Sequence, residues 1–162
     1  MQSGQCRVGV IGVGYLGAIH ARIYQRMPNV TLVGVTDTNG EVGERIAREC
    51  NSAFLPDSNA MLGQVDAVSI VVPTSVHREV SEPFLRSGVP VLLEKPVAHT
   101  LTDAQAIVDL ANKTGTLLQI GHLERFNAGG VRLVSELDRP RFIEVHRLGE
   151  FVERATDVDV VT

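Results

Sequence analysis

The sequence contains no tryptophan, and aromatic residues make up only 4% of its 162 residues. A protein that stacks bases or sugar rings needs a platform of such side chains, so we expect none here. Basic residues are also few, because 15 Lys and Arg stand against 19 Asp and Glu, for a formal net charge of −4. Without a dense basic stripe, neither nucleic acid nor a membrane surface is an expected partner.

Cysteine is scarce as well, with only Cys6 and Cys50 in the chain. Neither belongs to a CxxC pair or to a Cys/His cluster with zinc spacing, so we expect no metal site and two reduced, mostly buried thiols. No apolar run approaches the roughly 18 residues of a membrane-spanning helix. The N-terminus also lacks the charged and apolar regions of a signal peptide. The expected location is therefore the cytoplasm.

What the sequence does contain is a regular alternation of short β-branched runs and longer amphipathic stretches. It predicts strands at 6–11, 30–36, 53–55, 67–72, 89–93 and 116–120, and helices at 15–26, 40–50, a short stretch through 61–62, 75–87 and 102–114. Because each parallel crossover needs a helix, this order predicts an α/β fold with a doubly wound parallel sheet of the Rossmann type. Thr100 or Thr102 is expected to cap the last helix and Gly115 to end it, while Pro83 is expected to kink or shorten its helix.

The alternation stops after Gly121. A helix at 127–137 and a strand at 141–148 are predicted there, and 150–162 shows no clear element. We therefore divide the chain into a first domain at 1–121 and the truncated start of a second α/β domain at 122–162. A lone strand leaves its backbone N–H and C=O groups unpaired, so we expect residues 141–150 to pair with the same segment of another copy in a homo-oligomer.

A GxGxxG pattern follows the first predicted strand and opens the first predicted helix. Gly12 permits the tight turn, Gly14 leaves room for a pyrophosphate, and Gly17 lets the helix pack close to the strand. The helix N-terminus, where Tyr15 and Leu16 lie, attracts negative phosphates through its N–H groups and its dipole. In this context the pattern predicts a dinucleotide site.

Asp37 ends the second predicted strand, 20 positions after Gly17 (37 − 17). An acidic residue at this spacing can accept hydrogen bonds from the hydroxyls of the adenosine ribose. Its charge repels a 2′-phosphate, and it is followed by Thr38 and Asn39 rather than by arginine. These features favour NAD over NADP as the cofactor. The alternative is that Asp37 only caps a turn.

Two further segments follow predicted strands at the edge of the sheet where ligands bind. They are the run from Pro73 to His77 and the triplet Glu94-Lys95-Pro96. Combined with the glycine pattern and His20, they resemble the Gfo/Idh/MocA family of oxidoreductases, and the resemblance covers essentially the whole chain. It implies an NAD-dependent dehydrogenase that oxidises a secondary ring hydroxyl of a sugar.

The resemblance also implies a role for each matched residue. Lys95 would lie beside the nicotinamide and the substrate hydroxyl and act as the catalytic base. Glu94 would line the ribose and nicotinamide, although it could instead be an ion-pair partner for a nearby base. Thr74 and His77 would flank the cofactor, and the alternative for His77 is a packing role. We interpret His20 as structural.

The segment 121–127, GHLERFN, resembles the inter-domain segment of family members that oxidise nucleotide-linked amino sugars, the UDP-N-acetylglucosamine 3-dehydrogenases in particular. This implies that Arg125 and Asn127 approach the nicotinamide or the substrate, a UDP-linked N-acetylamino sugar. The alternative is a hinge held by hydrogen bonds.

One family feature is missing from the sequence. The catalytic His of the family lies in an Asp-x-x-x-His pattern, which we expect beyond Thr162, so residues 1–162 alone are expected to be inactive. Two other functions stay open, namely a non-catalytic NAD-binding or sensing module, and a stand-alone NAD-binding domain that works with a partner chain. Loss of the active-site lysine would be the expected mark of a non-catalytic member, and Lys95 is present.

Overall fold

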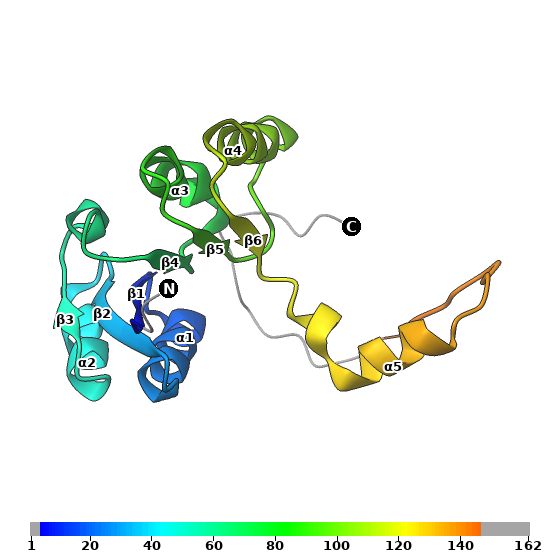
Figure 1. Cartoon of the computed structure of the whole chain (residues 1–162), viewed down its shortest axis with the longest axis horizontal. Coiled ribbons are helices and arrows are strands. Elements are labelled where there is room, and N and C mark those ends of the chain that lie inside the picture. The colour runs from blue at the N-terminus through cyan, green and yellow to red at the C-terminus, as the bar shows by residue number, and fades with distance from the viewer. Residues whose placement is uncertain (1–3, 147–162) are drawn as a thin grey trace.

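The computed structural model describes residues 4–146, and its centre is a parallel β-sheet (Figure 1). The strands are β1 (Cys6–Ile11), β2 (Val30–Thr36), β3 (Ala53–Phe54), β4 (Ala67–Ile70), β5 (Val91–Leu93) and β6 (Leu118–Ile120). Their order is β3-β2-β1-β4-β5-β6, and every neighbouring pair runs parallel. This confirms the predicted doubly wound sheet of the Rossmann type.

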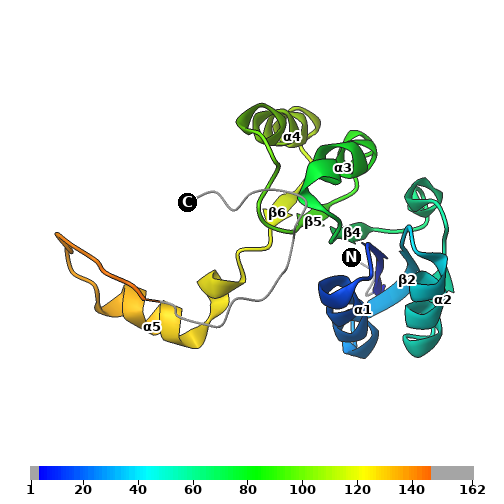
Figure 2. The same ribbon diagram turned by 180° about the vertical axis from the view of Figure 1, so that it is seen from behind.

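Helices cover the two faces of the sheet in pairs. On one face lie α1 (Tyr15–Arg26) and α2 (Gly40–Glu49), and on the other lie α3 (His77–Arg86) and α4 (Leu101–Thr114) (Figures 1 and 2). Short 3₁₀ turns η1 (Ser58–Met61) and η2 (Thr74–Val76) precede β4 and α3. Because strand side chains alternate between faces, each pair of helices closes its own hydrophobic core. Phe84 and Ile107 mark the core under α3 and α4, and Val10 and Ile46 mark the core under α1 and α2.

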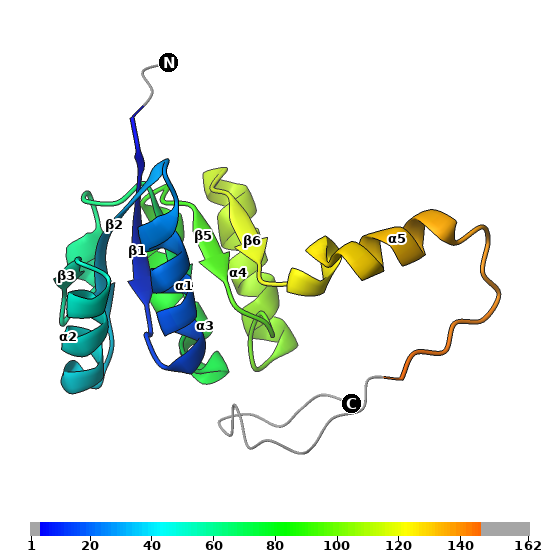
Figure 3. The same cartoon turned by 90° about the horizontal axis from the view of Figure 1, so that it is seen from below.

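The strand order reverses between β1 and β4, which lie side by side and lead away to opposite halves of the sheet. The arrows of β1, β5 and β6 end at one edge of the sheet (Figure 3). Loops that leave β1 and β4 diverge at this edge, and in open α/β sheets the resulting crevice is where ligands bind.

The ends of α4 confirm the predicted capping residues. The Thr100 hydroxyl accepts a hydrogen bond from the Asp103 N–H at 3.1 Å, and Gly115 ends the helix with a φ of 66°. Of the kink or early end predicted at Pro83, the early end is wrong, because α3 continues to Arg86. Proline removes one backbone donor from the helix, but the next two residues, Phe84 and Leu85, are fully buried and hold the last turn against the sheet.

The chain after β6 is exposed over almost its full described length. A 3₁₀ turn η3 (Leu123–Phe126) leads into α5 (Ala128–Glu136), which has no buried residue and extends away from the sheet (Figures 1 and 3). The strand predicted at 141–148 is wrong for residues 141–146, which form none. A strand needs a neighbour for its hydrogen bonds, and the sheet of the described residues ends at β6. Residues 147–162 lie outside the described residues, and pairing with another copy stays a prediction.

The two cysteines differ in their surroundings. Cys50 is buried as predicted, but Cys6 is exposed, because it begins β1 at the end of the sheet where the first two residues of the strand remain open to water. Across 4–146, no helix is both long and apolar enough to cross a bilayer.

Candidate functional site

The loop between β1 and α1 has the geometry that its glycines predict. Gly12 has a φ of 81°, in the left-handed region, and a side chain at Gly17 would collide with the carbonyl of Gly12. At Gly14, by contrast, a Cβ would meet nothing within 4 Å. Gly14 is also the N-cap of α1, and it has no side chain that could accept hydrogen bonds from the first N–H groups of the helix. A phosphate oxygen can accept these hydrogen bonds instead.

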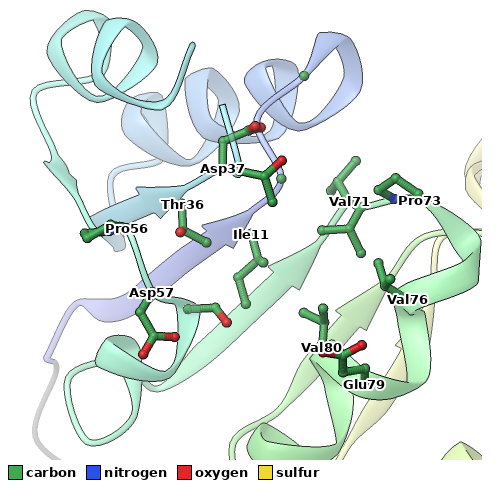
Figure 4. Close-up of a pocket in the computed structure, with 15 residues that line it drawn as sticks. Ile11, Thr36, Asp37, Pro56, Asp57, Val71, Pro73, Val76, Glu79 and Val80 are labelled. Carbon is green, nitrogen blue, oxygen red and sulfur yellow. The ribbon is translucent and has the colours of Figure 1, made fainter. Parts of the chain in front are cut away.

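A cavity of about 770 Å³ lies beside this loop (Figure 4). Its size is suited to a small molecule such as a dinucleotide. The walls come from the glycine loop, from the carboxyl ends of β2, β3 and β4, and from α3. The lining includes backbone at two glycines, three carboxylates and two valines, namely Gly12, Gly14, Asp37, Asp57, Glu79, Val72 and Val76.

Asp37 both lines this cavity and holds its backbone in place. One carboxylate oxygen accepts a hydrogen bond from the Val13 N–H at 2.7 Å, and the other accepts one from the Asn39 N–H at 2.8 Å. Asp37 therefore does cap a turn, as the alternative interpretation proposed, and it does so at the wall of the cavity. Two further carboxylates, Asp57 and Glu79, line the same space, and no Lys or Arg is among the lining residues.

Sequence reasoning missed Asp57 and Glu79. Asp57 follows β3 closely, so the rule that selected the loops after β4 and β5 would also have found it. Glu79 lies inside α3, where nothing in the spacing separates a lining residue from a solvated one.

Glu94 lies at the carboxyl end of β5 and is buried, with only 5% of its surface exposed. Its Oε2 accepts a long hydrogen bond from the Lys95 N–H at 3.3 Å. Its Oε1 is packed against Gly121, where a Cβ would lie 2.5 Å from this oxygen. His20 Nε2 lies 3.6 Å from the same oxygen, so a base is indeed near Glu94. Burial lowers the pKa of His20, and the charge of Glu94 opposes that shift.

Lys95 follows Glu94 directly and is exposed. The Lys95–Pro96 peptide bond is cis. Because β1, β5 and β6 run parallel, the residues that follow them, including Glu94, Lys95 and Gly121, lie at the same edge of the sheet as the glycine loop.

Thr74 and His77 follow β4 and are both buried, His77 with 1% of its surface exposed. The two ring nitrogens of His77 lie 3.0 Å from the Val72 carbonyl and 3.2 Å from the Val97 carbonyl. A ring between these carbonyls joins the loop after β4 to the loop after β5. This geometry supports the packing role that was the alternative for His77.

Arg125 and Asn127 are exposed, and neither lines the cavity as the described residues form it. The Asn127 side chain caps α5, because its Oδ1 accepts a hydrogen bond from the Gly129 N–H at 2.9 Å. Its Nδ2 donates to Glu124 Oε2 at 3.0 Å. The alternative of a hydrogen-bonded hinge therefore has direct support at Asn127.

Comparison with known proteins gives a consistent result. The family model Gfo/Idh/MocA, described as "Oxidoreductase family, NAD-binding Rossmann fold", matches residues 6–122. The UDP-N-acetylglucosamine 3-dehydrogenase of Acidithiobacillus ferrooxidans is 39% identical over 156 residues, which are 96% of this chain and 49% of that protein. The scyllo-inositol 2-dehydrogenase (NAD(+)) of Bacillus subtilis is 32% identical and aligns with 76% of this chain and 37% of its own length.

Solved structures agree with these sequence matches. The structure of the Acidithiobacillus ferrooxidans enzyme superposes with a TM-score of 0.77, over 81% of this chain and 43% of that chain. GenD2 from gentamicin A biosynthesis, solved in complex with NAD, gives a TM-score of 0.69 at 26% identity, over 73% of this chain and 34% of that chain. The present chain thus spans about half the length, or less, of the relatives it matches.

Proposed function

The chain belongs to the Gfo/Idh/MocA oxidoreductase family with its NAD-binding Rossmann fold, and from this premise we propose that it is the cofactor-binding part of a sugar dehydrogenase. The whole protein would oxidise a secondary ring hydroxyl to a ketone, and its substrate would be a UDP-linked N-acetylamino sugar. The proposed substrate rests on the 39% identity to a UDP-N-acetylglucosamine 3-dehydrogenase. This match extends past the dinucleotide fold into the segment that contains Arg125 and Asn127.

The residues of the cavity fit NAD on geometric grounds. The open space at Gly14 and the uncapped start of α1 suit the pyrophosphate. Asp37 would accept hydrogen bonds from the adenosine ribose, and Val72 and Val76 would form an apolar wall for the adenine, which is supported by the place of all three in the cavity lining. Three carboxylates without a lining Lys or Arg disfavour a 2′-phosphate, so we propose NAD rather than NADP.

At the other end of the cofactor, the proposed reaction needs a base for the hydroxyl proton. NAD, when bound, supplies the hydride acceptor. In this proposal Lys95 orients the hydroxyl and receives its proton at Nζ. Its position after β5, at the ligand-binding edge, and its exposure support that role. Glu94, buried just before it, lines the nicotinamide ribose. His77 holds the neighbouring loop through the Val72 and Val97 carbonyls, and Thr74 begins the 3₁₀ turn η2 of that loop.

Residues 1–121 form the dinucleotide-binding domain in this proposal, and 122–162 begin the substrate domain. The absence of buried residues in α5 supports that division, because a helix with an apolar side normally packs against another element. The proposed substrate domain would bring Arg125 and Asn127 to the sugar.

A substrate panel tests the proposal. The whole protein is incubated with NAD and with UDP-linked N-acetylamino sugars, UDP-hexoses, inositols or free hexoses, and NADH formation is followed by absorbance. We expect activity with a UDP-linked N-acetylamino sugar and its loss in Lys95→Ala. Activity confined to inositols or free hexoses would contradict the substrate, and NAD binding without activity on any sugar would favour the non-catalytic module.

A further inference from the structure

One oxygen of the Glu94 carboxylate stands out because it is buried without a hydrogen-bond partner. Glu94 Oε1 has essentially no exposed surface, and among residues 4–146 no donor lies within hydrogen-bond distance of it. An unsatisfied buried carboxylate oxygen is costly, since its desolvation is not compensated. The oxygen therefore needs a donor, and the neighbouring groups indicate which one.

His20, on the buried side of α1, is the polar side chain that faces this oxygen. Its Nε2 lies 3.6 Å from Glu94 Oε1, slightly beyond the usual N–H···O range of about 2.7–3.2 Å. Its Nδ1 lies 2.8 Å from the Ser69 hydroxyl of β4. The ring is thus held between a hydroxyl and a carboxylate, and only 8% of the residue is exposed.

These two partners select one tautomer of the imidazole. A carboxylate only accepts hydrogen bonds, whereas a serine hydroxyl either donates or accepts. With the proton on Nδ1, the lone pair of Nε2 would face the Glu94 oxygen, and the two would repel each other. With the proton on Nε2, the ring donates to Glu94 while Ser69 donates to Nδ1. Burial lowers the pKa of His20, which favours the neutral ring in which this choice exists.

Tyr24 completes the arrangement one turn further along α1. Its ring meets that of His20 edge to face, with centroids 6.4 Å apart. Burial raises the pKa of the Tyr24 hydroxyl, and a hydrogen bond with Ser69 opposes that shift. With the proton on Nε2, Ser69 donates to Nδ1, so each ring nitrogen of His20 faces a group of complementary hydrogen-bonding character.

We propose that His20 is a positioning residue, which donates from Nε2 to Glu94 and fixes the carboxylate at the nicotinamide end of the site. Gly121 limits the same carboxylate as well, because a Cβ at this position would lie only 2.5 Å from Oε1. His20 and Gly121 together define where Glu94, and through the main chain Lys95, meet the cofactor. The inference rests on the proposed function, in which Glu94 lines the nicotinamide ribose.

The tautomer can be measured directly on residues 1–162 without any ligand. Long-range ¹H–¹⁵N correlation spectra of the ¹⁵N-histidine-labelled chain distinguish a protonated ring nitrogen from an unprotonated one. We expect His20 in the Nε2–H form at pH 7.5, and a larger share of the Nδ1–H form in Ser69→Ala. A predominant Nδ1–H form in the wild type would overturn the proposal.

The positioning role is tested with two probes, NADH and ADP-ribose, which lacks the nicotinamide. We expect His20→Leu to weaken NADH binding about tenfold, the loss of roughly one hydrogen bond to a charged group, while ADP-ribose binding is unchanged. His20→Gln, whose amide can still donate to Glu94, should restore most of the affinity. His99→Leu, at an exposed histidine, is the matched control.

Equal NADH affinity in wild type and His20→Leu, or equal weakening of both probes, would overturn the positioning role. If His20→Leu does not fold, Gly121→Ala offers a second variant, because its Cβ would displace the Glu94 carboxylate, and it should show the same loss confined to NADH. Gly40→Ala is its control, because a Cβ at Gly40 meets nothing within 4 Å. A wild-type chain that binds neither probe would contradict the proposed function instead. In that case the NMR measurement of the His20 tautomer still tests the His20–Glu94 hydrogen bond, because it needs no ligand.

Discussion

Asp37 both stabilises the backbone of two loops and lines the cavity proposed for the cofactor. Its two oxygens hold the N–H groups of Val13 and Asn39, so it fixes the glycine loop and the turn after β2 at the same time. The same carboxylate lies at the wall of the cavity with Asp57 and Glu79. A 2′-phosphate brought into this space would meet three negative charges and no lining cation, and this is the physical reason to expect a preference for NAD over NADP.

We therefore expect residues 1–162 to bind NADH more tightly than NADPH, and Asp37→Ala to reduce that preference about tenfold. Some preference should remain, because Asp57 and Glu79 keep their charges. Calorimetric titration with both cofactors measures this, and Asp138→Ala, at an exposed aspartate, is the control. Equal or tighter binding of NADPH by the wild type, or an unchanged preference in Asp37→Ala, would contradict this role of Asp37.

His20 predicts a pH dependence of stability. Burial lowers its pKa in the folded chain, while the unfolded chain has the ordinary value of 6.5. As the pH falls below about 6.5, the unfolded chain takes up the proton first, so the free energy of unfolding decreases by at most about 1.4 kcal/mol per pH unit. The decrease stops once the folded chain is protonated as well. Above pH 6.5, His20 adds no pH dependence.

Urea denaturation of the wild type and of His20→Gln at a series of pH values isolates this contribution, because the carboxylates titrate in both proteins. The wild type should lose more stability than His20→Gln between about pH 6.5 and 5. Parallel pH profiles would show that the imidazole titrates equally in the folded and unfolded chains.

At the scale of single helices and strands, the sequence predicts best those boundaries that depend on the residue type at one position. The Thr100 hydroxyl caps α4 and Gly115 ends it in the left-handed region, as their residue types require. Strand ends are less well predicted, since β5 begins at Val91 rather than at Val89. Pro83 did not end α3, because tertiary burial of Phe84 and Leu85 outweighs one lost backbone hydrogen bond.

The α4 cap gives an element-scale prediction. The Thr100 hydroxyl accepts a hydrogen bond from the Asp103 N–H and donates one to the Asp103 carboxylate at 2.8 Å. The hydroxyl therefore satisfies one of the free backbone N–H groups at the start of α4. Thr100→Ala should lower the free energy of unfolding by about 0.5–2 kcal/mol, measured by urea denaturation. Thr102→Ala, at an exposed position inside the helix, should change it by much less. Equal effects of the two substitutions would show that the cap contributes nothing.

Features that depend on distant partners could not be predicted from the sequence. The strand predicted at 141–148 had the right alternation, but residues 141–146 have no neighbouring strand and leave Phe142 and Val145 exposed. The cavity wall at Glu79, and the approach of His20 to Glu94, join residues from separate elements. Their meeting depends on how α1 and α3 pack on the sheet, which no spacing along the chain records.

At the scale of the whole molecule, the parallel sheet brings residues far apart in the sequence to one edge. The glycine loop, Asp37, Glu94 and Gly121 all follow strands and lie where the carboxyl ends meet. Lys95 lies at the same edge and is exposed, as are Arg125 and Asn127. The described residues thus provide a wall for the cofactor, while the proposed substrate side is open to water.

We therefore expect residues 1–162 to bind NADH but to show no dehydrogenase turnover. An open site neither holds the sugar nor excludes water, and an incomplete catalytic group can lose nearly all of its effect. The assay follows NADH formation with NAD and the substrate panel, with the whole protein as the positive control. Substrate-dependent NADH formation by residues 1–162 would show that the catalytic group is already complete within them.

The central claim is that the carboxyl edge of the sheet binds NAD, with the pyrophosphate over Gly14 and the nicotinamide at Glu94 and Lys95. Titration of the ¹⁵N-labelled chain with NAD, followed by amide chemical shifts, tests it most directly. We expect saturable shifts of Gly12, Gly14 and Asp37 at one end of the site and of Lys95 and Gly121 at the other, with ADP-ribose shifting only the first group strongly. Saturable shifts elsewhere on the sheet, or none at these residues, would contradict it.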